Sequence, residues 1–471
     1  MSETGLKLAQ DKMAGAGIPQ QAIDVFTYYY RQLEEGVSGF IPEDSIDPLL
    51  DPSMLSDTAV SEEDAAAALQ KTVIIKLNGG LGTSMGMDKA KSLLPVRKAK
   101  SFLDIIVDQV RHARARYGIQ LPLLFMNSFR THQDTLAALA PYGDLAVSGL
   151  DLGFLQNQEP KLKADDLTPI TWPAAAGLEW CPPGHGDLYT ALTTSGMLDR
   201  LLSLGYRYAS VSNSDNLGAA PNATIAGWFA TTGAPYAAEI CRRTAADRKG
   251  GHLAIRKSDR RLILRDTAQT RKEEMDYFTD EFRHPFFHTN TLWFDLDALA
   301  RTLSERKSVL GLPLIKNEKT VDPADSSSAK VIQIETAMGA AIEVFEGATA
   351  IGVDRDRFLP VKTTSDLLVL RSDAYDLQAD GRLVKATDLT PVVDLDNKYY
   401  KIIGDFDHRF PAGAPSLKEA RYLEVNGDWT FEAGIRVIGE VILDDHGTPQ
   451  IIAAGSILSE ETEQAIGSQP G

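Results

Sequence analysis

The sequence predicts an α/β protein built around an open sheet, followed by a C-terminal part of a different texture. Three observations lead to this prediction. The apolar run at 73–75 enters a glycine-dense loop, as a buried parallel strand enters a ligand-binding turn. Segments of strand length then alternate with helical patterns up to about residue 380, which is the rhythm of βαβ units. Beyond that point the helical periodicity disappears, so we expect a separate β-rich unit there.

The composition indicates a globular protein of two or three units. Its 471 residues exceed the length of one ordinary domain, and 43% of them are hydrophobic. Lys and Arg number 48 against 65 Asp and Glu, a formal charge of −17, which argues against nucleic acid or an acidic membrane as the main partner. A phosphorylated substrate would therefore have to meet local positive charge.

The number of cysteines and the N-terminal segment indicate the cellular compartment of the protein. The two cysteines, Cys181 and Cys241, suggest neither a disulfide scaffold nor a zinc site. The segment at 1–12 has no apolar core of signal-peptide length, and no window approaches the ~20 apolar residues of a membrane span. We expect a cytoplasmic protein that does not enter a membrane.

Residues 1–70 are predicted to form a helical lead-in. An amphipathic pattern runs through 18–33, and Gly36 is placed to end that helix. Ser61 precedes an alanine-rich segment and is expected to be the N-cap of a second helix.

Residues 71–380 are predicted to form the core domain. Ser101 with Asp104 is typical of a helix start, and Gly118 of its end. An open α/β sheet binds ligands beyond the carboxyl ends of its strands, so the loops at those ends are the candidate site. Further helices are expected at 131–139 and at 187–204, with Asp187 as the N-cap of the second, and further strands at 121–126, 206–211, 236–241, 253–255, 286–294 and 348–353.

Residues 381–471 are predicted to form the β-rich unit. Phe431, Val437 and Leu443 recur every six residues, much as the coils of a β-helix would stack. An ordinary antiparallel meander would give the same pattern.

The glycine loop points to a nucleotide. Gly79, Gly80, Gly82 and Gly86 allow several backbone N–H groups to face one anion, and Lys91 adds a mobile positive charge. The dinucleotide fingerprint fails because Met85 stands where its third glycine should be.

The ATP-binding P-loop is also excluded, since Ala90 rather than glycine precedes Lys91 and Ser92. The loop is thus a phosphate-binding candidate of another kind, or a tight structural turn.

Three later stretches carry candidate chemistry. WCPPGHGD, at 180–187, places His185 beside a helix start, where main-chain N–H groups favour a phosphate. NSDN, at 213–216, follows a strand, and the carboxylate of Asp215 suits Mg²⁺ bridging to phosphate oxygens. Lys362 follows an apolar run and is a second candidate cation. Each stretch also has a structural alternative: a proline turn, an Asx turn and a solvated surface charge.

LNGGLGTSMG, at 77–86, with the downstream Lys91 and Ser92, closely resembles the signature loop of the UTP:glucose-1-phosphate uridylyltransferases of eukaryotic type. PPGHGD recurs in the same family, and the other matches follow in the family's order as far as residue 366. The resemblance implies a Rossmann-like, glycosyltransferase-A-like nucleotidyltransferase core with an open mixed sheet. It also favours a C-terminal left-handed β-helix, the part through which several relatives self-associate, so a homo-oligomer is possible.

The resemblance also implies a role for most of the residues quoted. Lys91 and Lys362 are implied to be catalytic, and Asp215 to hold Mg²⁺. The nucleotide is implied to contact Leu77, Asn78, Gly79, Gly80, Gln156, Gly184 and His185. The sugar is implied to contact Asn213, Asp215, Lys249, Gly250, Gly251, Asn290 and Glu335. One departure is that the relatives commonly have Gly-Pro-Lys-Ser where this chain has Lys89, Ala90, Lys91 and Ser92, which leaves open which amine reaches the phosphates.

The implied reaction joins UTP and glucose-1-phosphate into UDP-glucose and pyrophosphate, with Mg²⁺, by in-line displacement at the α-phosphorus. Two alternatives stay open at this point. The same machinery could act on galactose-1-phosphate or N-acetylglucosamine-1-phosphate, and a non-catalytic UDP-sugar-binding protein could share the fold. A nicotinamide oxidoreductase is disfavoured by the failed fingerprint at Met85.

Overall fold

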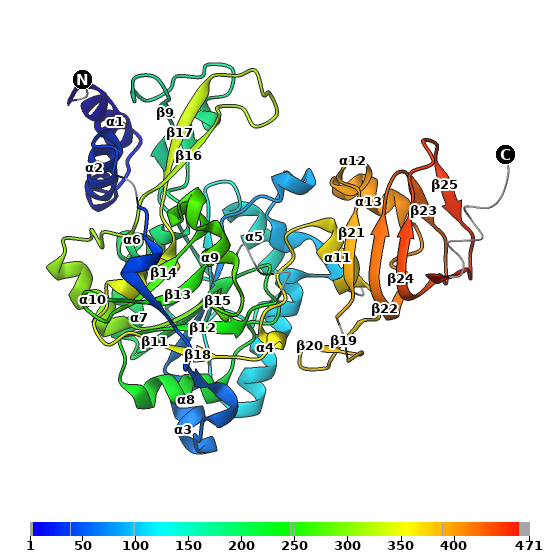
Figure 1. Cartoon of the computed structure of the whole chain (residues 1–471). Helices are drawn as coiled ribbons and strands as arrows, with labels where there is room; N and C mark the ends of the chain where they lie inside the picture. The colour runs from blue at the N-terminus through cyan, green and yellow to red at the C-terminus, as the bar shows by residue number, and fades with distance from the viewer. Residues whose placement is uncertain are drawn as a thin grey trace.

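The computed structural model describes residues 3–460, apart from 38, 98, 245, 246, 248, 249 and 389. Within these residues the main sheet has 11 strands, in the order β2-β18-β12-β15-β11-β3-β6-β7, with β1, β13 and β14 joined at one side (Figure 1). The strands are β1 (Ile46–Pro48), β2 (Ser53–Met54), β3 (Thr72–Asn78), β6 (Leu123–Asn127), β7 (Gly153–Leu155), β11 (Tyr208–Asn213), β12 (Tyr236–Arg242), β13 (His252–Arg256), β14 (Leu262–Arg265), β15 (Phe286–Asp295) and β18 (Thr349–Gly352).

Strand β3 lies near the centre of this sheet. All seven of its residues are buried, and it pairs in parallel with β11 and β6. Strand β15 runs antiparallel to β11, β12 and β13, so the sheet is mixed, as predicted. Ile74 belongs to one hydrophobic cluster, while Val73 and Ile75 belong to another. Alternate side chains of β3 therefore enter cores on the two faces of the sheet.

Two of the helices that cover the sheet show the predicted cap residues. Ser101 and Asp104 form a capping box at the start of α4 (Phe102–Tyr117), and Gly118 ends this helix at φ 65°. Ser61 accepts a hydrogen bond from the backbone of Asp64 as the N-cap of α3 (Glu62–Gln70). The other covering helices are α5 (His132–Leu139), α8 (Ala223–Thr232), α9 (Met275–Thr279) and α10 (Leu296–Glu305).

The helix predicted over 187–204 is wrong in two respects. It is broken into α6 (Leu188–Thr194) and α7 (Met197–Ser203), because Gly196 adopts φ 71° between them. Asp187 stands at the N-cap position of α6, as predicted, but its side chain makes no cap hydrogen bond. Its carboxylate instead accepts hydrogen bonds from the backbone and side chain of Asn157, which a reading of local sequence could not reveal.

The first seventy residues do more than lead into the core. Helices α1 (Glu3–Gly15) and α2 (Gln20–Glu34) lie beside a small sheet of β9 (Leu162–Lys163), β16 (Ile315–Thr320) and β17 (Lys330–Glu335) (Figure 1). The chain then crosses the main sheet and adds β1 and β2 to it, pairing with β13 and β18. No helix in the described part of the chain is both long and apolar enough to cross a membrane.

The strands from β21 (Val392–Leu395) to β26 (Ile457–Leu458) in the C-terminal unit pair in parallel. Leu423 pairs with Val441 and Val437 with Leu458, and the parallel pairing excludes the antiparallel meander. The six-residue repeat Phe431, Val437 and Leu443 is buried, as the coil pattern predicts. This unit and its approach contain α11 (Thr364–Arg371), β19 (Tyr375–Leu377), β20 (Leu383–Lys385), β21 (Val392–Leu395), α12 (Asn397–Tyr400), α13 (Ile403–Arg409), β22 (Ser416–Val425), β23 (Trp429–Phe431), β24 (Arg436–Leu443), β25 (Gln450–Ile452) and β26 (Ile457–Leu458).

Candidate functional site

Three asparagines mark the carboxyl edge of the main sheet. Asn78, Asn127 and Asn213 end β3, β6 and β11, and the register sets Asn78 against Asn127 and Leu77 against Asn213. The amide of Asn78 donates to Asn127 and Thr135, both at 2.8 Å, so this side chain holds the edge together. Among these residues the sequence did not single out Asn127, although a polar residue directly after an apolar strand was the available signal.

The glycine loop leaves this edge and folds back on itself. The backbone N–H of Lys91 donates to the carbonyl of Gly80 at 3.2 Å. A Cβ on Gly79 would lie 2.9 Å from the side-chain oxygen of Gln156, so the loop passes directly over this buried amide. Gly86 turns the loop at φ 74°. The predicted neighbours Gly79, Gly80 and Gln156 thus lie together, with Leu77 just before them.

Lys91, at the end of this loop, forms an ion pair. Its Nζ lies 2.8 Å from the Oδ2 of Asp215 and also donates to the carbonyl of Val361. Both charged side chains are about one-fifth exposed, at 18% and 21%. Lys362 comes directly after Val361 in the chain. Its side chain is exposed, and its backbone N–H donates to Asp366 at 2.7 Å. Three motifs far apart in the sequence therefore converge on one point.

The turn at 213–216 fixes the position of the segment before Lys362. Asn216 accepts the N–H of Leu359 at 2.8 Å, and the carbonyl of Asp215 accepts the N–H of Val361 at 3.3 Å. Because Asn216 is 2% exposed and its amide is engaged in this way, it is part of the framework.

The loop around His185 packs on the end of β17. Gly184 has φ 79°, and a Cβ there would lie 2.7 Å from the carbonyl of Thr336. The Nδ1 of His185 accepts the N–H of Met338 at 3.0 Å, which leaves the ring proton on Nε2. Burial lowers the pKa of His185, although nearby Glu335 opposes this, so the ring is a neutral donor.

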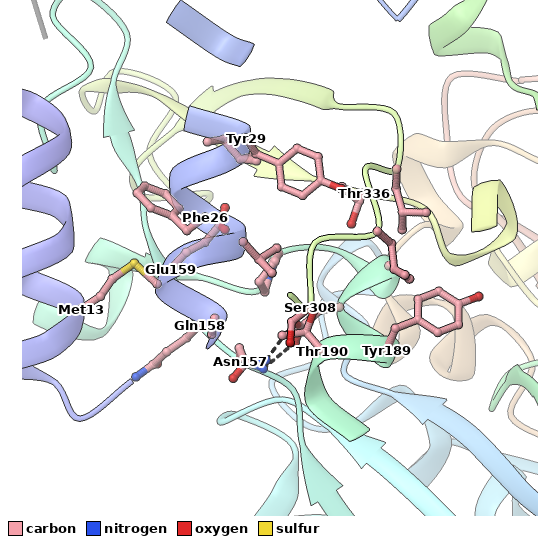
Figure 2. A pocket seen from close by; sticks show the side chains of 18 residues that line it. Met13, Phe26, Tyr29, Asn157, Gln158, Glu159, Tyr189, Thr190, Ser308 and Thr336 are labelled. Atoms are coloured by element: carbon pink, nitrogen blue, oxygen red, sulfur yellow. Dashed lines mark hydrogen bonds between the residues drawn. The ribbon is translucent and has the colours of Figure 1, made fainter. Parts of the chain in front are cut away.

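A small cavity lies behind this loop, between it and the N-terminal helices. Figure 2 shows Tyr29 of α2 pointing across the cavity toward Thr336, with Asn157 hydrogen-bonded on the opposite wall. The acceptor of those bonds is Asp187, at 2.6 and 2.8 Å. Burial raises the pKa of Asp187 to about 7 and that of the neighbouring Glu159 well above its usual range.

The expected sugar-contacting stretches also meet. Asn290 of β15 donates from its amide to Asn213 at 3.1 Å, and the N–H of His288 donates to the carbonyl of Gly251 at 2.8 Å. A Cβ on Gly339 would lie 2.8 Å from the ring of His288, which brings the 335–339 stretch to the same place. The carbonyl of Gly250 accepts a hydrogen bond from the guanidinium of Arg243. Lys249 lies outside the described residues.

The described residues contain no group of three or more His, Cys, Asp or Glu side chains arranged to hold a metal ion by themselves. Asp215 is one accessible carboxylate at the sheet edge. Mg²⁺ commonly binds through one or two carboxylates with substrate phosphates and water, so Asp215 fits an ion that arrives with a nucleotide. It does not fit a resident, fully protein-coordinated ion.

Together, an open α/β sheet, a glycine loop at its carboxyl edge and the lysine that this loop brings to Asp215 define the class as nucleotide-binding proteins. The family model described as UTP--glucose-1-phosphate uridylyltransferase matches residues 23–437, and the chain belongs to this family.

Its relatives cover nearly the whole chain. The Hordeum vulgare UTP--glucose-1-phosphate uridylyltransferase is 39% identical over 402 residues, covering 84% of this chain and 82% of its own. A crystal structure of Trypanosoma brucei UDP-glucose phosphorylase has a TM-score of 0.90 at 41% identity, covering 97% and 98% of the two chains. A mutant Leishmania major UDP-glucose pyrophosphorylase, in complex with UDP-glucose, has a TM-score of 0.90 at 40% identity with the same coverage.

Proposed function

We propose that this chain catalyses the reversible transfer of UMP from UTP to glucose-1-phosphate, giving UDP-glucose and pyrophosphate. The observation that carries the proposal is the convergence of Lys91, Asp215 and the segment before Lys362 beside the glycine loop. The family's activity supplies the substrates.

The reaction requires the protein to align the two substrates and to neutralise the charge of their phosphates. The phosphate of the sugar attacks the α-phosphorus of UTP in line, the new P–O bond forms, and pyrophosphate leaves with the electrons of the broken anhydride bond. A phosphate monoester has a second pKa of about 6 and is mostly ionised at neutral pH, so no general base is required. The site must hold two anions together and stabilise the leaving group.

Each cation has a place in this scheme. Lys91 stabilises the triphosphate and the leaving group, and Lys362 holds the attacking and α-phosphates. Asp215 holds Mg²⁺, which neutralises phosphate charge when bound. The ion pair between Lys91 and Asp215 supports this scheme, because it brings the two side chains to the same point of the sheet edge.

The remaining residues divide between the two substrates. Gln156, next to Gly79, reads the uracil edge, since an amide both donates and accepts. Leu77, Asn78 and Gly80 line the nucleotide site, and Gly184 and His185 approach the phosphates of the nucleotide. Asn213, Gly250, Gly251, Asn290 and Glu335 surround the glucose, together with Lys249, whose structure is not described.

The C-terminal unit is proposed to be a left-handed β-helix that mediates self-association of a cytoplasmic enzyme. Parallel strand pairing and the buried six-residue repeat support the β-helix. Exposed Ile451 and Ile457 on its outer coils provide apolar surface for association.

The reverse reaction tests the proposal. We expect UDP-glucose and pyrophosphate to yield UTP and glucose-1-phosphate with Mg²⁺, and the rate to fall to background with excess EDTA. A rate that EDTA leaves unchanged would remove Mg²⁺ from the scheme. The absence of UTP formation at any Mg²⁺ concentration would contradict the catalytic assignment itself.

A further inference from the structure

His288 is a buried histidine in the sugar-contacting half of the site, and the scheme above gives it no role. It lies on β15 and is 9% exposed. Its Nδ1 accepts the backbone N–H of Asn290 at 3.0 Å, so the ring proton is on Nε2. Within the described residues this Nε2 has no hydrogen-bond partner.

The backbone at this point explains why Asn290 needs such a partner. The pairing of β12 with β15 shifts register here: Glu239 faces Thr291, but Ile240 faces His288. Residues 289 and 290 therefore form a bulge, outside the hydrogen-bond ladder. An unpaired N–H in a buried bulge costs about 1–3 kcal/mol, and the ring of His288 supplies the missing acceptor.

The bulge also places Asn290 in an unusual conformation. Its φ of 59° is in the left-handed region, which residues other than glycine rarely adopt, although Asn tolerates it better than most. The conformation is held from two sides. His288 binds the N–H of Asn290, and Asn213 accepts its side-chain amide at 3.1 Å. Loss of the contact with His288 would free the backbone to relax and turn the carboxamide away from Asn213.

We propose that His288 is a positioning residue, which holds Asn290 in the conformation that binds the sugar and so sets the affinity for the glucosyl group. The proposal rests on the proposed function, specifically on the role of Asn290 toward glucose. His288 is suited to the task because burial, reinforced by the nearby His185, lowers its pKa to about 3. The acceptor at Nδ1 is therefore available throughout the neutral pH range.

Two substitutions separate positioning from direct contact. His288→Asn keeps an acceptor near the Nδ1 position, whereas His288→Gln keeps polar atoms near Nε2 and loses that acceptor. His288→Leu removes both. The measurement is the ratio of the Kd for UDP to the Kd for UDP-glucose, determined by calorimetry, because this ratio isolates the sugar and does not depend on turnover.

We expect His288→Leu and His288→Gln to reduce this ratio about tenfold, and His288→Asn to stay within about threefold of the wild type. The Kd for UDP should be unchanged in all three variants, and the same order should appear in the KM for glucose-1-phosphate. Rescue by Gln rather than Asn would overturn positioning in favour of direct contact by Nε2. Equal ratios in all variants, or a weakened Kd for UDP that matches the sugar effect, would also overturn it.

Asn290→Ala is the matched control. It separates the positioning role of His288 from the sugar contact of Asn290. A reduced ratio in Asn290→Ala with a normal ratio in His288→Leu would overturn the positioning role alone. A normal ratio in Asn290→Ala would instead contradict the sugar-binding assignment of Asn290, on which the inference depends.

Discussion

At the residue scale, the two lysines of the glycine loop differ in their contacts. Lys91 contacts Asp215 and the carbonyl of Val361, whereas the side chain of Lys89 is exposed. We therefore expect Lys91→Ala to reduce kcat/KM for UTP at least ~100-fold, the usual scale for a lost charge stabiliser. Lys89→Ala should stay within about threefold of the wild type in steady-state assays. Equal losses in the two variants would contradict this assignment.

A single substitution also tests the role of Lys362. Its exposed side chain contributes little to packing, and the N–H bond to Asp366 does not depend on the side chain. Lys362→Ala should therefore lose most of its turnover while the melting temperature remains that of the wild type. Near-normal turnover in this variant would remove Lys362 from the mechanism.

Asp187 is expected to make stability depend on pH. Burial outweighs the hydrogen bonds from Asn157 and raises the pKa from 3.8 to about 7 in the folded state. The folded protein thus binds one more proton than the unfolded chain between these values. The stabilisation is complete below pH 4 and is lost as the pH rises through 7, with a slope of up to about 1.4 kcal/mol per pH unit.

The measurement is the difference in melting temperature between the wild type and Asp187→Asn across pH 4 to 8. The wild type should lose stability relative to the variant as the pH rises. A difference that is constant with pH would show that Asp187 is ionised throughout.

At the element scale, local signals predicted helix ends well and long-range contacts poorly. The caps at Ser61 and Ser101 depend on residues within three positions, so the sequence displays them. Asp187 also looked like a cap, but its carboxylate is used by Asn157, thirty positions away. The pairing of the 182–187 loop with the end of β17 is likewise a tertiary contact, without a local signal.

That pairing gives an element-scale prediction. Gly184→Ala adds a Cβ at φ 79° and 2.7 Å from the carbonyl of Thr336, so the loop must move away from β17. We expect a melting temperature several degrees lower and at least a tenfold loss of turnover. Gly177→Ala is the matched control, because a Cβ there meets nothing within 4 Å. Equal behaviour of the two variants would show that the loop does not need this contact.

At the scale of the whole molecule, the C-terminal unit contacts both lysine-bearing segments. A Cβ on Gly86 would lie 2.9 Å from Ile402, so the glycine loop rests on the C-terminal unit. Ser365, three residues after Lys362, accepts the N–H of Leu395 at 3.2 Å. The β-rich texture was visible in the sequence, but these contacts were not. Ser365 and Leu395 are thirty positions apart, and Gly86 and Ile402 are more than three hundred positions apart. The glycine loop and the segment after Lys362 thus both contact the C-terminal unit.

The most direct test of the central claim is pyrophosphate release with Mg²⁺. UTP should be offered with glucose-1-phosphate, galactose-1-phosphate or N-acetylglucosamine-1-phosphate, and glucose-1-phosphate with ATP, GTP or TTP. We expect release with UTP and glucose-1-phosphate, and loss of this release in Lys91→Ala and Lys362→Ala. Comparable release with several sugars would replace glucose specificity with a general UDP-sugar activity. No release with any pair would contradict the account and favour a non-catalytic UDP-sugar-binding protein.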